Sequence, residues 1–507
     1  MPARFLLVAL AATLLPTSAS AVQRLELKKD EPGAAGIEVS GEYRVQGSFL
    51  TDFAVDAEGT QIGQSAVLDH RLRFRFDLQV RIVRFSTEWD ISSGQLVGDL
   101  WDIPGTVDAR NRHAYGALTP AGFFPRRAAV TVTPNDSIVI EAGLVTSHWG
   151  LGMLANNGAS DPFFGRNDFG DRVVRFRFTG RPAAPLFVTG AFDWVIGDDI
   201  GEFGQQQLAF QGLGSVVYRD LIRQAGLYAV YRHQEESDGR ATDVAVFDLF
   251  VDRWGDLFKD VERTQETGWS LRLAAEGALI VGRTNRSLSY NEREALTVIS
   301  GGLTGVATLY APEKRVGFHV RGGLGSSDGD SDDGFSNDFT FDRDFDVGFV
   351  LFDHVQGGVE AATHALVTDP ENTGYAPDGA EVLATEGSFR RGVFLQPIVT
   401  VAPAPWLEFR LGVAAAATTA PVRHPFYAFR AGGSDRNHHN VTPSSRYLGT
   451  EIDWAVRLGG ELPVPTEEKP RVEALIQGGH AILGGALRSG EEEEVVHHLL
   501  LTGRFRW

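Results

Sequence analysis

The chain has 507 residues, no cysteine, 33 phenylalanines and a formal net charge of −19. The absence of cysteine excludes a disulfide scaffold, a cysteine-based metal site and a lipid-anchored N-terminal cysteine. A soluble chain of this length would normally divide into about two to four domains, but no composition shift or linker divides this one.

Residues 1–21 are predicted to be a secretory signal peptide. Arg4 supplies a positive charge, Phe5 to Leu15 form an apolar run, and Ala19-Ser20-Ala21 provide a small-residue cleavage site. The expected mature chain starts with a tail at 22–36. No later apolar run reaches the roughly 18 residues that a membrane helix needs, so we expect an exported protein without a helical anchor.

The segment His70–Val80 alternates strictly between two kinds of side chain. Arginine occupies positions 71, 73 and 75 and aspartate position 77, while leucine or phenylalanine occupies the positions between them. Successive side chains of a strand point to opposite faces, so one face is apolar and the other charged. In a soluble sheet the apolar face would be the core, whereas in a membrane barrel it would face lipid and the charged face the lumen.

The same alternation recurs along the mature chain, in segments of about the ten residues that a tilted transmembrane strand needs. Clear examples are residues 37–49, 173–179, 269–281, 315–321, 407–413 and 448–458. The connections alternate too: short turns with proline, such as 181–185 and 402–405, separate long stretches such as 93–125, 149–170 and 419–445. Short turns at one rim and long loops at the other indicate an outer-membrane barrel.

We therefore predict an all-β fold, a transmembrane antiparallel up-and-down β-barrel over residues 37–507. The strand count reaches about 18 if residues 326–387 form one long external excursion. Sixteen remains open, because the strands near 80–92 and 242–251 are poorly delimited. Residues 345–366 fit a helix about as well as a strand, so this excursion is expected either to plug the barrel or to form a surface helix or an extra hairpin.

The last strand ends in GRFRW. Phe505 and Trp507 lie on its apolar face, and Arg504 and Arg506 lie on the other. An alternating last strand with a terminal aromatic residue resembles the membrane-insertion signal of bacterial outer-membrane barrels, although the glycine of that pattern would fall at Thr502. A soluble enzyme that ends in a strand is the alternative.

Three regions resemble the alginate-export-like group of outer-membrane barrels, in particular an uncharacterised branch of that group. They are Tyr447–Asp453 with Gly478-Gly479-His480, then Glu141–Gly152 with Asn167–Val173, and residues 341–355. The resemblance implies an eighteen-stranded barrel with a basic channel for anionic solutes. It does not identify alginate as the solute.

The inward-facing charged residues are the predicted functional site, a channel lining. Fixed guanidinium groups would concentrate anions in a confined channel. The predicted lining residues are Arg71, Arg73, Arg75, Arg175, Arg177, Arg272, Arg315, Arg321, Arg410, Arg457, Asp453 and Glu451. The alternative is that arginines and carboxylates pair across neighbouring strands and only satisfy a polar interior.

No metal site or cofactor is expected. The stretch Asp328–Gly334 superficially suggests a calcium loop, but Phe339 stands where an EF-hand needs a bidentate glutamate. Adjacent histidines such as His497 and His498 face opposite sides of a strand and cannot share one ion. No catalytic motif is present, although a hydrolytic triad at the rim would be recognised only in space.

The expected function is passive diffusion of anionic or polyhydroxylated solutes through an arginine-lined outer-membrane channel of a Gram-negative-type bacterium. The expected partners are lipid, lipopolysaccharide, the barrel-assembly machinery and the solute, with no nucleic acid. Two alternatives stay open: a plugged barrel with a structural or surface-attachment role, and an outer-membrane hydrolase with its site on the rim.

Overall fold

The computed structural model describes residues 25–26, 35–98, 123–166, 170–198, 207–236, 239–256, 268–286, 295–330, 333–369, 371, 387–424, 426–428, 435–462, 469–490 and 492–507. The predicted signal peptide and most of the predicted N-terminal tail lie outside these residues. None of the helices described here is long and apolar enough to cross a membrane.

Eighteen of the strands in the described residues form one closed antiparallel barrel, which confirms the predicted fold and decides against sixteen strands. They are β2 (Ala35–Ala54), β3 (Gln61–Val80), β4 (Val83–Gly98), β5 (Phe124–Asn135), β6 (Ile138–Thr146), β7 (Arg172–Ala183), β8 (Leu186–Gly197), β9 (Leu208–Arg219), β10 (Arg223–Glu235), β11 (Ala241–Asp256), β12 (Ser270–Thr284), β13 (Leu296–Tyr310), β14 (Val316–Gly325), β16 (Gly392–Ala404), β17 (Leu407–Thr418), β18 (Tyr447–Glu461), β19 (Arg471–Leu483) and β20 (Val495–Arg506).

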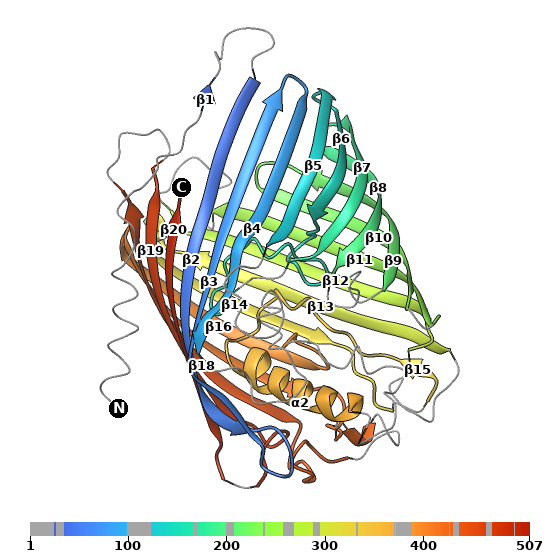
Figure 1. Ribbon diagram of the computed structural model, residues 1–507, viewed down its shortest axis with the longest axis vertical. Helices are drawn as coiled ribbons and strands as arrows, with labels where there is room; N and C mark the ends of the chain where they lie inside the picture. Colours follow the sequence, from blue (N-terminus) through green and yellow to red (C-terminus); the bar gives the residue numbers. More distant parts are fainter. Residues whose placement is uncertain are drawn as a thin grey trace.

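The barrel closes because β20 pairs with β2 along Glu42↔Arg506 to Leu50↔His498. Each other strand pairs with its neighbours in chain order, and Figure 1 shows the resulting continuous wall. A closed sheet leaves no unpaired edge in the hydrocarbon layer, where unsatisfied backbone groups would cost several kcal/mol each.

Five elements of the described residues lie outside the barrel wall. They are β1 (Leu25–Glu26), β15 (Phe335–Ser336), the 3-10 helix η3 (Pro312–Lys314), the π-helix η4 (Leu351–Gln356) and the α-helix α2 (Gly357–Thr368). The pairing of β14 with β16 shows that the chain leaves the wall after Gly325 and rejoins it at Gly392. The helical part of the ambiguous pattern at 345–366 is therefore η4 and α2, and no extra barrel strand forms in the described part of this excursion.

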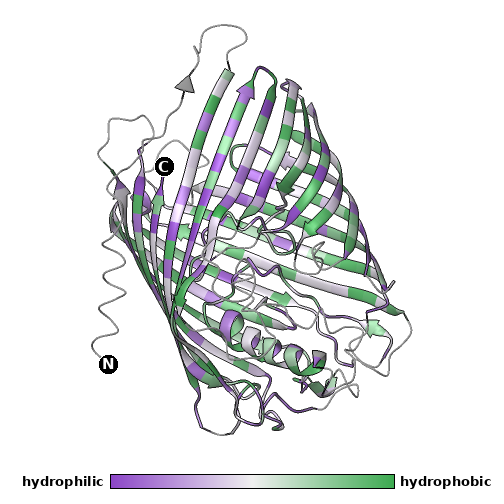
Figure 2. Ribbon diagram, viewed as in Figure 1, coloured by the Kyte–Doolittle hydropathy of each residue, from purple (hydrophilic) through white to green (hydrophobic). Residues whose placement is uncertain are grey.

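Apolar side chains are distributed in the opposite sense to a soluble protein. Phe176 on β7 is 59% exposed and Leu249 on β11 is 57% exposed, whereas Asp193 on β8 is fully buried. Figure 2 shows the corresponding alternation of hydrophilic and hydrophobic residues along the strands. An apolar outer face around a polar interior is the distribution that a barrel in a lipid bilayer requires.

The two rims differ in the lengths of their connections. Two-residue turns join β3 to β4, β5 to β6, β7 to β8 and β16 to β17 at one rim. At the other rim lie connections 99–123, 147–171, 326–391 and 419–446. The intermediate connections 257–269 and 462–470 belong to the short-turn rim, so the asymmetry holds for most of the connections rather than for all of them.

Candidate functional site: the inner wall and two segments that fold against it

The arginines of β3 point into the barrel, and each of the three meets a carboxylate. Arg71 Nη2 lies 2.8 Å from Glu42 Oε1 on β2. Arg73 binds Asp90 on β4 through two hydrogen bonds of 2.7 and 3.0 Å. Arg75 Nε donates to Asp77 Oδ2 at 2.6 Å along its own strand. Side chains two positions apart share one face of a strand, so the alternation itself places these charges together.

The predicted arginines on β7, β12, β17 and β18 are paired in the same way. Their ion pairs are Arg175–Asp193 and Arg272–Asp252 across neighbouring strands, Arg177–Glu141 across β6 and β7, and Arg410 and Arg457 with the shared Glu408. Pairing of arginines with carboxylates, which the sequence left open as an alternative, is therefore observed, mostly across neighbouring strands and for Arg75 and Arg410 along one strand. Pairing does not remove all donors, because a guanidinium carries five N–H groups and one carboxylate accepts at most two of them in a bidentate pair.

Two predicted lining arginines do not face an open lumen. Arg315 is not on the inner wall: β14 begins one residue later, and the Arg315 side chain is 65% exposed in the turn, where it pairs with Glu313 at 2.7 Å. The alternation was extended one residue too far into the turn. Arg321 does face inward, but its guanidinium carbon lies 5.0 Å from the centre of the Phe345 ring, so the excursion covers it.

Glu451 and Asp453 on β18 face inward but do not line an open lumen, since neither has exposed surface. The Glu451 carboxylate accepts backbone N–H groups from Phe349, Val350 and Leu351, with lengths of 2.8 and 2.7 Å for the last two. Glu451 therefore anchors the start of η4 to the wall. An acidic side chain near a helix N-terminus is also favoured by the helix dipole.

The segment around η4 and α2 forms an apolar core inside the barrel (Figure 1). Phe339, Phe341, Phe349 and Phe352 are each at most 2% exposed, and Phe394 of β16 packs against this group edge to face. Apolar burial of this kind contributes about 1.5–3 kcal/mol for each large side chain. The excursion thus packs as a folded body against the wall and occupies part of the lumen.

The connection 147–171 between β6 and β7 also folds inward and touches opposite sides of the wall. At its start, Trp149 Nε1 donates to Asp248 on β11 at 3.0 Å, and the backbone N–H of Leu151 donates to Glu276 on β12. Further along, Arg166 Nη1 lies 3.0 Å from Asp69 on β3. The connection therefore crosses the interior between β11–β12 and β3.

Acidic residues of the excursion join these two inward segments. Asp342 Oδ2 accepts the Asn156 backbone N–H at 3.0 Å, and Asp344 Oδ2 accepts the Gly170 backbone N–H at 2.6 Å. The Asn156 side chain donates in turn to the Asp344 carbonyl at 3.0 Å. The acidic residues at 342 and 344 thus bind backbone amides, a role that spacing alone does not reveal.

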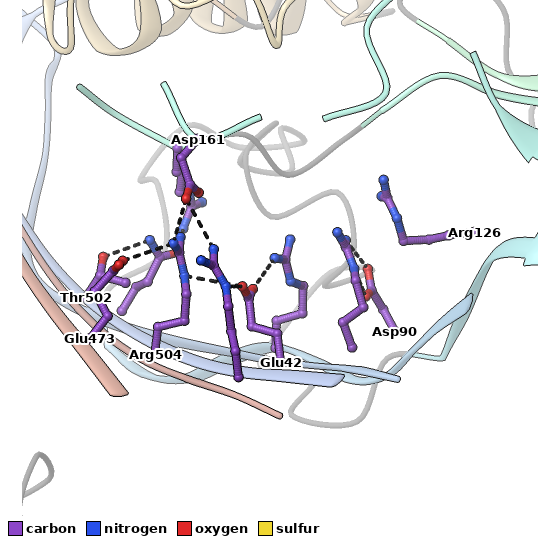
Figure 3. A network of polar contacts seen from close by, with 12 residues as sticks. Glu42, Asp90, Arg126, Asp161, Glu473, Thr502 and Arg504 are labelled. Carbon is purple, nitrogen blue, oxygen red and sulfur yellow. Dashed lines mark hydrogen bonds and ion pairs between the residues drawn. The ribbon is translucent and has the colours of Figure 1, made fainter. Parts of the chain in front are cut away.

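A polar network joins charged side chains of β2, β3, β4, β5, β19 and β20 along this wall (Figure 3). Arg126 of β5 bonds Glu88 of β4 at 3.1 Å. Arg504 of β20 contacts Glu473 of β19 at 3.1 Å, and Arg506 contacts Glu42 at 2.8 Å.

Sequence reasoning missed part of this network. Glu42, Arg504 and Arg506 are not among the predicted lining residues, although the alternation places both arginines on the charged face of the last strand. Asp161 of the β6–β7 connection contacts both of these arginines, with Nη–Oδ2 distances of 3.0 and 3.2 Å. Burial raises the pKa of the Asp161 carboxyl, but the two guanidinium groups outweigh burial and hold the pKa below its usual value.

Phe505 and Trp507, the predicted insertion signal, stack on one another with ring centroids 5.4 Å apart. The backbone of Trp507 exchanges two hydrogen bonds with Gly41, of 2.9 and 3.0 Å. The last residue therefore takes part in closing the barrel. Its role in recognition by an assembly machinery stays a prediction.

Among the residues that the structure describes, no three histidine, aspartate or glutamate side chains form a group that could hold a metal ion. The acidic stretch that starts at Asp328 binds its own backbone: Asp328 accepts the N–H groups of Asp330 and Asn337. Asp338 pairs with Arg391 at 2.6 Å.

Comparisons with known proteins agree with the geometry at the level of fold. No family model matches the chain, and no curated protein matches it in sequence. The crystal structure of OccAB1 from Acinetobacter baumannii matches 96% of this chain and all of its own, with a TM-score of 0.50 and 9% identity. The chain has the fold of an outer-membrane porin.

Two Pseudomonas aeruginosa structures also match, OccK2 (OpdF) at 11% identity and OccK8 (OprE) at 9%. Each covers 93% of this chain and 98% of its own, with a TM-score of 0.48. The alginate-export-like group is not among these matches, so membership of that group stays a proposal.

Proposed function

We propose that the protein is an outer-membrane channel through which anionic or polyhydroxylated solutes diffuse passively along an arginine-rich wall. The observation that carries the proposal is the inward network of Figure 3, in which arginines of β3, β5 and β20 share a few carboxylates. A row of paired charges offers a solute both N–H donors and carboxylate acceptors. Hydroxyl groups use both kinds of partner, and a solute carboxylate uses the donors.

The proposed location is the outer membrane of a Gram-negative-type bacterium, with lipid and lipopolysaccharide around the apolar outer face. The exposed phenylalanine and leucine side chains of β7 and β11 support this location. The barrel-assembly machinery is proposed to recognise the strand that ends in Phe505 and Trp507. No catalytic step and no cofactor are proposed, and assignment to the alginate-export-like group rests only on the motifs at 141–152, 341–355 and 447–453.

A second candidate function is a plugged barrel with a structural or surface-attachment role. The observation that favours it is the apolar core around Phe341 and Phe352, which fills part of the interior with side chains that exclude water. The two candidates differ in one measurable property. A channel conducts ions, whereas a fully plugged barrel does not.

Single-channel recording in a planar bilayer, with a salt gradient to give the reversal potential, separates the candidates. A channel gives discrete open steps with anion preference, and the triple variant R71A/R73A/R75A reduces that preference. R315A is the control for position, because it removes one arginine charge from a turn outside the inner wall. Silence from a demonstrably folded barrel favours the plugged one, and equal effects of the two variants would contradict the arginine-lined path.

A further inference from the structure

Asp161 differs from the other carboxylates that bind the arginines of β20. Glu42 and Glu473 belong to the wall strands β2 and β19, and their side chains are only 14% and 8% exposed. Asp161 belongs to the β6–β7 connection, and its side chain is 52% exposed. It reaches the wall from the lumen side and places one oxygen, Oδ2, between Arg504 and Arg506 (Figure 3).

The backbone beside Asp161 is fixed while its side chain is not enclosed. Arg410 of β17 donates to the carbonyl oxygens of Pro162 and Phe163 at 3.1 and 2.9 Å. Arg504 is held in turn by Glu473, so the two sides of the contact are positioned independently of it. A half-exposed aspartate changes rotamer within nanoseconds, so the carboxylate can leave the arginines without movement of the anchored loop.

We propose that Arg504 and Arg506 form a binding site for one carboxylate group of a permeating solute, and that Asp161 is a built-in occupant which the solute displaces. The inference rests on the proposed channel function and names its substrate class, small organic acids such as sugar acids. Exchange replaces one carboxylate by another on the same guanidinium groups. The charge-assisted hydrogen bonds lost by Asp161 are therefore regained by the solute.

Competition with a tethered group has a useful physical effect on transport. A solute that had to bind an unoccupied pair of arginines would gain the full interaction and leave slowly. Because Asp161 competes for the same guanidinium groups, the site binds the solute more weakly than an unoccupied pair of arginines would. Conduction through a channel requires binding that is favourable but weak enough to permit exit.

The test measures block of chloride current through the full mature chain by gluconate, with sorbitol as the uncharged analogue of the same size. D161N is expected to lower the half-blocking concentration of gluconate about tenfold, the change that loss of a competing charge-assisted pair produces. R504Q/R506Q is expected to raise it. D220N is the matched control, because it removes one aspartate charge from the turn between β9 and β10, away from the arginines.

A second variant tests the role of the Asp161 charge without the asparagine side chain of D161N. The chain has no cysteine, so D161C introduces a single thiol. Attachment of an ethylsulfonate group by a thiosulfonate reagent restores a negative charge and should return the half-blocking concentration toward that of the wild type, whereas an ethylammonium group should not.

Equal block of D161N, D220N and the wild type would overturn the inference and leave the channel proposal intact, as would equal block by gluconate and sorbitol. A wild-type barrel that is folded but silent would overturn both.

Discussion

Replacing Glu451 by alanine should release the start of η4 from the barrel wall. The fully buried carboxylate accepts three consecutive backbone N–H groups, from residues 349 to 351, and alanine leaves all three without this acceptor. A buried donor left unsatisfied costs about 1–3 kcal/mol. Water can reach some of these three N–H groups after local opening, so we take the low end of that range for each. The total cost to docking of the segment is then about 3 kcal/mol.

A cost of about 3 kcal/mol shifts the equilibrium between docked and undocked segments by roughly 150-fold. The barrel itself should persist, because β14 and β16 pair directly without help from the segment between them. Hydrogen exchange of residues 345–368, measured by mass spectrometry on the refolded protein, should therefore accelerate strongly in E451A while exchange of the wall strands stays slow. The single-channel conductance should rise.

Glu473→Ala serves as the comparison, since it removes a buried glutamate from the neighbouring strand β19 whose bonds go to Arg504 rather than to the excursion. Unchanged exchange at 345–368 in E451A would refute the anchoring role. So would an equal acceleration in E473A, which would indicate a general loss of stability.

Three further predictions concern separate parts of the molecule. Valine at Gly41 would place its Cβ against the indole ring of Trp507, so G41V should lower the yield of closed barrel. The yield is measured from heat-dependent mobility in gel electrophoresis, and a wild-type yield would contradict the closing role of that contact. W149F keeps an aromatic ring stacked on Tyr228 but removes the N–H donor to Asp248. Loss of this hydrogen bond should lower the free energy of docking by about 1–2 kcal/mol and speed amide exchange of residues 149–153. Unchanged exchange would argue against this anchor. Burial lowers the pKa of His438 to about 3. The unfolded loop therefore binds more protons than the folded loop between that pH and about 6.5, and the folded loop loses stability as the pH falls through this range. Residues 435–441 should become sensitive to protease near pH 4 in the wild type but less so in H438Q.

The alternation of side chains could predict most of the wall. On β3 the period of two predicted which face each arginine would occupy. The count of alternating segments, with residues 326–387 taken as one excursion, predicted about eighteen strands and left sixteen open. The prediction for Arg315 was wrong because this residue lies next to a strand end. The alternating sequence pattern continues there, but the backbone already belongs to the turn. Such an end is set by the turn residues Pro312–Lys314 and not by the hydrophobic pattern.

The inner packing could not be predicted in the same way. Asp161 and Arg504 are 343 residues apart, and only the path of the β6–β7 connection through the interior brings them together. The sequence pattern at 345–366 fitted either secondary structure, and the choice of helix depends on the inner face of β18, where Glu451 receives the first backbone N–H groups. Contacts of this kind depend on a wall that already exists, so local sequence carries little information about them.

The closure of β2 on β20 has a consequence for the order of assembly. Strand β2 is among the first to be synthesised and cannot find its second neighbour until β20 has been made. The wall positions that hold the excursion include Phe394 of β16 and Glu451 of β18, and both strands follow the excursion in the chain. The chain must therefore keep a phenylalanine-rich segment from misassociating until its site is built. Charged residues within an apolar segment oppose misassociation. Asp342 and Asp344 occupy such positions, and in the finished interior they bind backbone amides.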